Sequence, residues 1–237
     1  DPHLAAMLLA AKKERALPEM RVIVAALSVP DPRRRPPEKQ ADADYAHRTF
    51  AEPNSDFLTL LTLWHSFFDS GKQKTASRGE KAFCRRHYLS YGRMREWLDV
   101  HRQLCRMPGM GGGSARRARE VPFDPLHRAI LAGLVSNVAR KTDQGTYRAA
   151  RGRELEVFPG SVLFGERPPW IVFHEVVETT RLYARSLAKI DPLWVEKRAP
   201  QLCRYSWGEP AFDPSFGNVS TTETVSIFDL PLVTGRR

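Results

Sequence analysis

The spacing of apolar residues changes along the chain, and the change divides it into two kinds of structure. In the first half, apolar residues recur every three to four positions, as at Leu4, Met7, Leu8 and Ala11, which is typical of amphipathic helices. Between 134 and 190 the apolar residues fall in short runs separated by turn signals, which favours strands. The pattern therefore predicts an α+β multidomain protein, with a helical bundle followed by a small β module.

The helical half is interrupted at recognisable places. Prolines at 30, 32, 36 and 37 end the second of two helices expected within 1–28, because proline lacks the amide donor that a continuing helix needs. We expect further helices over 38–51, with Tyr45 and Phe50 buried, over 57–70, and from 80 to about 104. Asn54, Ser55 and Asp56 supply N-cap oxygens for the 57–70 helix. Later helices are expected over 124–134 and 192–200.

Five runs have strand character: 136–141, 146–150, 154–158, 170–179 and 181–190. Five closely spaced strands favour a closed barrel, because closure removes exposed strand edges. In the last run, a strict two-residue alternation puts Tyr183, Arg185, Leu187 and Lys189 on one face and the smaller apolar residues on the other. Two more strand-like runs are expected in the short C-terminal extension.

Charge narrows the class of partner. The chain of 237 residues is 42% hydrophobic and has a formal net charge of +10, so a sizeable core and a polyanionic partner are both expected. The cations are spread over loops and the β module, not along one amphipathic helix, which favours nucleic acid over a membrane surface. With neither a long apolar run nor a signal-peptide layout, the expected location is cytoplasmic.

Catalytic and metal chemistry have little support in the sequence. The three cysteines are scattered without a CxxC pair, and the histidines show no HExxH spacing. His174 is interpreted as a hydrogen-bonded structural residue of a strand. Met107 to Arg119 is expected to be a flexible connector because of its glycines at 109–114, either a natural insertion or an engineered shortening. It lacks the lysine of a phosphate-binding loop.

Several motifs resemble one family throughout the chain. The segments AILAGLVSNVAR, FPGSVLF and HEVVETTRLYARSLAKIDPLW are similar to the oligonucleotide-binding (OB) domain of DEAH/RHA-type RNA helicases. The segments ALSVPDPRRRP, SDFLTLL and FCRRHYLSYGRMREW are similar to the winged-helix remainder and ratchet bundle that precede that domain, and the SDF form resembles the bacterial HrpA-type branch. Many members carry a histidine before the proline of the FPGS turn, where this chain has Phe158.

The resemblance implies three regions: a winged-helix remainder with ratchet bundle at 1–120, a five-stranded OB-fold barrel at 121–200, and the start of a further region at 201–237. It also implies an accessory, strand-guiding role in a 3'-5' ATP-dependent RNA helicase. The sequence holds no Walker lysine and no Asp-Glu-Ala-His box, so ATP hydrolysis by this chain is not expected. ATP and Mg²⁺ belong to motor domains elsewhere in the parent chain, of which this sequence is expected to be a piece.

The expected partners are single-stranded RNA, those motor domains, and regulatory or ribosomal factors. RNA-binding candidates on the barrel are Arg148, Arg151 and Arg153, with Lys141 nearby and Ser161 in the Pro-Gly-Ser turn. Tyr147 is a candidate either for base stacking or for core packing. On the ratchet bundle the candidates are Asn54, Ser55, Arg86 and Arg93.

Two other functions remain open from the sequence. One is a protein-interaction platform, with Trp194, Trp207 and Phe212 as an exposed apolar patch that receives regulatory partners. The other is a stand-alone binder of single strands.

Overall fold

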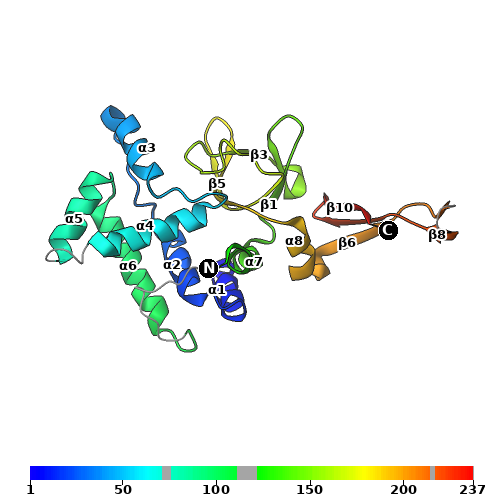
Figure 1. Cartoon of the computed structure of the whole chain (residues 1–237), viewed down its shortest axis with the longest axis horizontal. Helices are drawn as coiled ribbons and strands as arrows, with labels where there is room; N and C mark the ends of the chain where they lie inside the picture. The colour runs from blue at the N-terminus through cyan, green and yellow to red at the C-terminus, as the bar shows by residue number, and fades with distance from the viewer. Residues whose placement is uncertain (71–75, 111–121, 214–216, 237) are drawn as a thin grey trace. The chain divides into compact units, whose positions relative to one another are not determined.

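The computed structural model describes residues 1–70, 76–110, 122–213 and 217–236, and it divides into two compact units (Figure 1). Asp1–Gly133 forms a helical unit and Leu134–Arg237 forms a β-rich unit. Most of the glycine-rich connector expected at 109–114 lies outside the described residues. The order of helices before a five-stranded barrel confirms the expected fold class.

The helical unit follows the predicted periodicity closely in its first half. Its helices are α1 (Pro2–Lys13), α2 (Leu17–Leu27), α3 (Gln40–Arg48), α4 (Asp56–Ser70), α5 (Ala76–Arg86), α6 (Tyr91–Arg106) and α7 (Phe123–Leu134), with a 3-10 turn, η1 (Pro37–Lys39), before α3. The first helix starts where the Asp1 carboxylate accepts a hydrogen bond from the His3 amide, as an N-cap does. The second helix ends at Leu27, before the proline-rich segment, as predicted.

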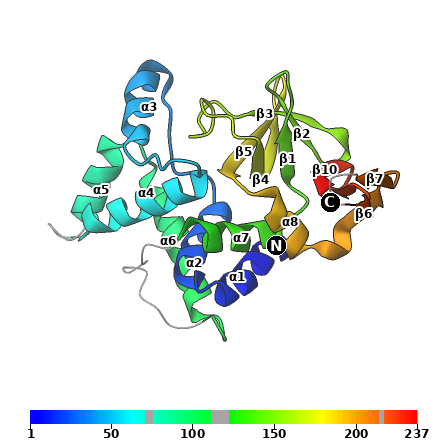
Figure 2. The same ribbon diagram turned by 45° about the vertical axis from the view of Figure 1, so that its right-hand side comes forward.

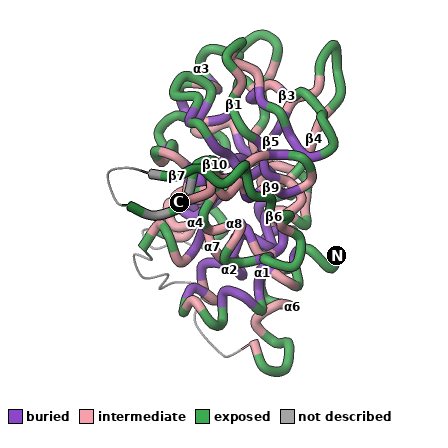
Figure 3. The backbone as a smooth tube through the Cα atoms, turned by 90° about the vertical axis from the view of Figure 1, so that its right-hand side faces the viewer, coloured by how far each residue is buried: buried purple, intermediate pink, exposed green. Residues whose placement is uncertain are grey.

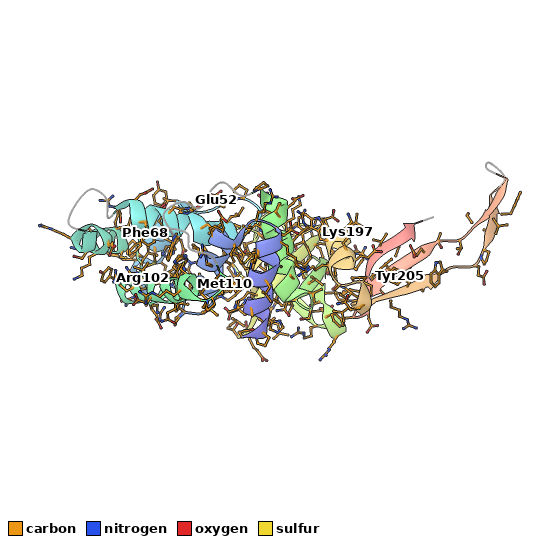
Figure 4. All side chains as sticks on the ribbon, turned by 90° about the horizontal axis from the view of Figure 1, so that it is seen from below. Glu52, Phe68, Arg102, Met110, Lys197 and Tyr205 are labelled. Carbon is orange, nitrogen blue, oxygen red and sulfur yellow. The ribbon has the colours of Figure 1, made fainter. Side chains whose placement is uncertain are left out.

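Two tryptophans form the centre of the helical core. The rings of Trp64 on α4 and Trp97 on α6 lie 5.0 Å apart, and neither residue is exposed to solvent. The indole nitrogen of Trp97 donates to the carbonyl oxygen of Val22 on α2 at 2.9 Å, so the one polar atom of the ring is satisfied. These contacts join α2, α4 and α6 around one apolar cluster. Arg102 remains on the exposed side of α6, where it pairs with Asp99 at 3.1 Å (Figure 4).

The single long helix expected from 80 to about 104 is wrong, because the chain turns between α5 and α6. Tyr88 adopts a left-handed φ of 51°, and its carbonyl oxygen accepts from the amide of Arg34 at 2.8 Å. The Ser90 amide donates to the Pro32 carbonyl at 2.8 Å. The proline-rich segment therefore pairs with this turn, and that long-range pairing outweighs the local helical preference.

Burial also differs from expectation at one aromatic position of α3. Phe50 is buried as predicted, but Tyr45 is 75% exposed. The two buried residues of α3 are Ala43 and Ala46, so the helix packs through small side chains and turns Tyr45 outward. The prediction of Tyr45 as a core anchor was therefore wrong.

The helix α7 packs with the helical unit, although its sequence belongs to the motif expected to open the barrel domain. The Nδ1 atom of His3 lies 2.8 Å from the carbonyl oxygen of Gly133, and Arg128 pairs with Glu14 at 2.8 Å. A Cβ atom at Gly133 would lie 2.2 Å from the His3 carbonyl oxygen, so only glycine permits this approach. The division between units therefore falls after Gly133, later than the expected boundary at 120.

All five predicted barrel strands are present, and they form a closed barrel. The strands β1 (Val138–Lys141), β2 (Tyr147–Ala149), β3 (Glu154–Val157), β4 (Trp170–Glu178) and β5 (Leu182–Lys189) are ordered β1-β2-β3-β5-β4, and β1 also pairs with β4. Figure 2 shows β1, β4 and β5 side by side. The pairing of β3 with β5 is parallel and the other pairings are antiparallel. A short 3-10 turn, η2 (Ala150–Gly152), joins β2 to β3.

The expected alternation fails in the second half of β5. Ala184 faces the barrel core as predicted, but Leu187, expected on the outer face, is also a core residue. Ser186, between them, has a left-handed φ of 54°, which breaks the two-residue period of the strand. Its neighbour β4 places Phe173 in the core opposite Leu187.

The C-terminal part of the β-rich unit adds a helix and two small sheets. The helix α8 (Pro192–Arg198) begins at Asp191, whose carboxylate accepts from the Leu193 amide at 2.9 Å; a 3-10 turn, η3 (Pro200–Leu202), follows it. The strands β6 (Cys203–Trp207), β9 (Glu223–Ile227) and β10 (Leu230–Arg236) form a sheet in the order β10-β9-β6, and β7 (Ala211–Asp213) pairs with β8 (Asn218–Ser220). Figure 3 shows β7 on the exposed surface.

Candidate nucleic-acid interface

A row of charged side chains crosses the outer face of the barrel. Arg140 on β1 lies opposite Arg148 on β2, and Arg148 lies opposite Glu154 on β3. All three are exposed, whereas their neighbours Ala139 and Tyr147 are buried in the barrel. Arg140 was absent from the predicted set. The signal in the sequence was its place directly after the apolar Val138 and Ala139, which are both buried.

Arg151, within η2, and Arg153, directly after it, line a polar pocket of about 330 Å³. The other lining residues are Ser136, Asn137, Ala150 and Phe228. Ser136 and Asn137 precede β1, and Phe228 lies in the turn between β9 and β10. The structure thus brings two of the predicted cations into one concave site. The aromatic residue beside them, Phe228 of the C-terminal extension, was not among the predicted site residues.

The cationic candidates of the barrel are available to a ligand. Arg148, Arg151 and Arg153 are exposed, and within the described residues none of them forms an ion pair with a carboxylate. Lys141 is also exposed at the end of β1, and its backbone amide donates to the Pro169 carbonyl at 2.9 Å. Cations that are neither buried nor neutralised are suited to contact phosphate oxygens.

Tyr147 is a core residue, so of its two interpretations, base stacking and core packing, the structure supports core packing. Its side chain has 0% exposure, and its hydroxyl donates to the Pro168 carbonyl at 2.6 Å. Burial raises the pKa of the Tyr147 hydroxyl to about 12. The ring therefore fills the barrel and is not placed to stack on a base.

Ser161 forms hydrogen bonds within its own turn. Its amide donates to the Phe158 carbonyl at 2.9 Å, and its Oγ accepts from the Leu163 amide at 3.2 Å. The residue is only 9% exposed. The expected phosphate contact through the amide is therefore wrong, because the amide proton already has an acceptor within the turn, and the contact through the hydroxyl stays a prediction.

The four candidates on the helical unit fall into two groups. Ser55 is fully buried; its Oγ accepts from the Leu58 amide at the start of α4 and lies 2.7 Å from His127 Nε2, so its assignment to RNA is wrong. Arg86 and Arg93 are exposed, and Asn54 is half-exposed with a left-handed φ of 66°. The Nη1 atom of Arg93 donates to the Asp31 carbonyl at 2.8 Å, which holds this guanidinium against the proline-rich segment.

The histidines with large pKa shifts are buried in the helical unit. Burial lowers the pKa of His127 to about 4, and burial together with nearby Arg21 and Arg102 lowers the pKa of His101 to about 4. Both are therefore neutral at physiological pH and have structural roles. Across the described residues, no group of three or more His, Cys, Asp or Glu side chains is arranged to hold a metal ion. No helix in those same parts of the chain is long and apolar enough to cross a membrane.

Two family descriptions match the chain in the order of its structural elements. "Helicase associated domain (HA2), ratchet-like" matches residues 1–60, and "Oligonucleotide/oligosaccharide-binding (OB)-fold" matches residues 126–202. The second match contains all five barrel strands and ends before β6. Phe228 therefore lies beyond the region that the OB-fold family describes.

The chain is similar over its whole length to bacterial helicases. It is 38% identical to the ATP-dependent RNA helicase HrpA of Escherichia coli and 36% identical to its homologue from Haemophilus influenzae, and each alignment covers 100% of this chain. It is 30% identical, over 87% of its length, to the pre-mRNA-splicing factor ATP-dependent RNA helicase prp22 of Schizosaccharomyces pombe. The chain spans only 18% of the length of the two bacterial relatives and 17% of the fission-yeast relative.

Proposed function

Because this chain belongs to the C-terminal region of the HrpA-like DEAH-type helicases, we propose that it binds single-stranded RNA and guides the strand for its parent helicase. The parent enzyme in this proposal is an ATP-dependent 3'-5' RNA helicase that acts in the cytoplasm. The chain itself performs no catalytic step. ATP and Mg²⁺ are bound by motor domains of the same parent polypeptide, which are also its principal protein partners.

The observation that carries the proposal is a set of exposed cations on one part of the barrel that form no ion pair with any carboxylate in the described parts of the chain. Arg140 and Arg148 are cross-strand neighbours on the outer face, and Arg151 and Arg153 line one pocket beside the β2–β3 turn. Phosphate contacts of this kind position a strand without selecting its bases. Such a surface holds an RNA strand of any sequence and lets it move, which is the property that a translocating helicase needs.

Salt dependence tests the proposal directly. Fluorescence anisotropy of the chain with a labelled single-stranded RNA is measured at two salt concentrations. Neutralising about three phosphates predicts a slope of roughly −2 in log K against log salt, so affinity falls about 20-fold between roughly 50 and 200 mM salt. A peptide nucleic acid of the same base sequence, which lacks phosphates, is the matched control and should bind weakly at both concentrations. Absence of RNA binding, or binding that is independent of salt, contradicts the proposal.

A second candidate is a platform for a regulatory protein. Trp207 on β6 is 65% exposed, and Phe212 on β7 and Val219 on β8 are 64% and 68% exposed. Phe212 and Val219 are cross-strand partners, so their side chains lie on the same face of the hairpin. Trp194, the third residue of the expected patch, is half-buried. Replacing Phe212 and Trp207 by Ser should abolish binding of a regulatory protein and leave the RNA titration unchanged.

A further inference from the structure

The pocket at η2 is lined by residues from two parts of the chain, the barrel and the C-terminal extension. Five of its six lining residues belong to the barrel domain, and the sixth, Phe228, belongs to the turn that connects β9 and β10. The OB-fold family match ends at residue 202. This site is therefore completed by a residue from outside the barrel, and its chemistry differs from that of the barrel surface alone.

The lining is suited to a ligand with both an anionic and an apolar part. Arg151 and Arg153 supply guanidinium groups, and no carboxylate residue lines the pocket. Ser136 supplies a hydroxyl, which both donates and accepts. The Nδ2 atom of Asn137 donates to the His174 carbonyl at 3.1 Å, which fixes the orientation of the amide and leaves Oδ1 as its acceptor. Phe228 is half-buried and supplies the only aromatic ring among the lining residues.

Two of the lining residues are held in an unfavourable backbone conformation. Arg151 has φ 62° and Phe228 has φ 47°, both in the left-handed region. Left-handed backbone is costly for a residue with a Cβ, and a two-residue hairpin turn ordinarily places Asn, Asp or Gly there. Non-glycine residues kept in this region cluster at ligand sites. The chain keeps an arginine and a phenylalanine at these two positions, and both face the same pocket.

The pocket is larger than a simple anion requires. Its volume of about 330 Å³ lies within the range of sites for small organic ligands, roughly 300 to 1,000 Å³. A single phosphate group would occupy only the part beside the two arginines. The remaining space, next to Phe228, fits a ribose or a base.

We propose that this pocket binds one nucleotide unit of the RNA strand, with its phosphate between Arg151 and Arg153 and its base or ribose against Phe228. The proposal rests on the proposed function, because it takes the same RNA strand as the ligand. It adds that the C-terminal extension is part of the RNA site. Stacking on an aromatic ring accepts any base, so this contact anchors one nucleotide without introducing sequence preference.

Single substitutions in the full chain test the assignment. Phe228→Ala should weaken binding of a single-stranded RNA about 5-fold or more, because loss of one stacking contact has an effect of that order. Phe212→Ala removes an exposed ring of the same kind from β7, outside the pocket, and should leave affinity unchanged. Arg153→Ala should weaken binding about 5- to 10-fold, whereas Lys197→Ala, which removes the same charge from the exposed end of α8, should have little effect. Thermal denaturation confirms that each variant is folded.

Crosslinking gives a readout that does not depend on affinity. RNA containing 4-thiouridine is irradiated with the chain, and the adduct is mapped by fragmentation within the tryptic peptide 205–236, which contains no internal lysine or arginine before 236. The expected adduct lies at Phe228 or its immediate neighbours. An adduct confined to the region of Phe212 overturns the proposal.

Competition experiments distinguish a nucleotide from a simple anion as the ligand of the pocket. Uridine monophosphate should displace the RNA at a lower concentration than inorganic phosphate, and Phe228→Ala should remove that difference. Equal competition by phosphate and the nucleotide identifies a simple anion site and overturns the nucleotide assignment. If Phe228→Ala and Arg153→Ala bind RNA normally while Arg148→Ala does not, the pocket is excluded and the proposed function stands. If the unmodified chain does not bind RNA, both fail.

Discussion

The Oγ atom of Ser55 lies 2.7 Å from the Nε2 atom of His127, and both residues are completely buried. The Nδ1 atom of His127 lies 2.6 Å from the Phe123 carbonyl oxygen. Because a carbonyl only accepts, Nδ1 carries the proton and Nε2 accepts from the Ser55 hydroxyl. The same Oγ accepts from the Leu58 amide at 3.3 Å. One serine thus caps α4 and fixes α7 against it.

The buried imidazole makes stability depend on pH. Burial lowers the pKa of His127 to about 4, below the value of about 6.5 expected in the unfolded chain. Between these values the unfolded chain binds a proton that the folded chain does not, so stability is full above about pH 6.5 and falls as the pH decreases towards 4. His127 should remove about 2 kcal/mol of the free energy of unfolding between pH 7 and pH 5.

Urea denaturation of the chain at pH 7 and pH 5 measures that loss. The His127→Gln variant should be less stable at pH 7 but should lose about 2 kcal/mol less than the unmodified chain when the pH is lowered. His101, whose pKa is also about 4, remains in both proteins and provides the common background. An identical pH dependence for the two proteins would show that His127 titrates normally in the folded chain.

Gly133 should tolerate no side chain. A Cβ atom there would lie 2.2 Å from the His3 carbonyl oxygen and 2.7 Å from the Cγ of Met7, so Gly133→Ala must push α7 away from α1. We expect it to reduce the free energy of unfolding by about 2 kcal/mol. Gly92 in α6 is the matched control, because its new Cβ would meet nothing closer than the Ser90 Oγ at 4.0 Å.

Gly92→Ala should stabilise the chain by about 0.5 to 1 kcal/mol, since alanine favours a helix more than glycine does. Both variants are measured by thermal and urea denaturation. Equal effects at the two positions would contradict the close approach of α1 and α7.

Arg148 and Arg151 should contribute to RNA binding without supporting the fold. Their double replacement by Ala should lower affinity about 10-fold or more at low salt and reduce the slope of log K against log salt by about 1 to 2. Lys197 and Arg198, both exposed on α8, give a double alanine variant with the same net charge. RNA titration at several salt concentrations compares the two. Similar losses in both variants would indicate a general effect of net charge instead of a site.

Tyr147→Phe should destabilise the barrel while leaving RNA affinity unchanged. The substitution removes the hydroxyl that donates to the Pro168 carbonyl at 2.6 Å and leaves that oxygen without this donor. The expected loss is about 1 to 2 kcal/mol. Thermal denaturation measures it, and RNA titration of the folded variant gives the control. Unchanged thermal stability would be inconsistent with a buried, hydrogen-bonded hydroxyl.

The elements of the fold were largely readable from the sequence. The five barrel strands, the early helices and the proline-rich break were predicted because strand alternation, helical spacing and proline act over a few residues. The same local alternation indicates that Arg148, between the buried Tyr147 and Ala149, points outward. The motifs shared with the DEAH-type helicases also lie within continuous segments, so the family was recognisable before the structure.

Several of the outcomes that the sequence did not decide depend on residues distant in sequence. Ser55 is buried against His127, the core interpretation of Tyr147 depends on Pro168, and the turn at Tyr88 pairs with Arg34. No local pattern reports such pairings, because periodicity indicates which face a residue occupies but not what meets that face. The pocket shows this division between sequence and tertiary structure most clearly. The sequence by itself determined that Arg151 and Arg153 are exposed cations. Only the tertiary structure placed Phe228 beside them, because the turn that holds Phe228 is far from both arginines in the sequence.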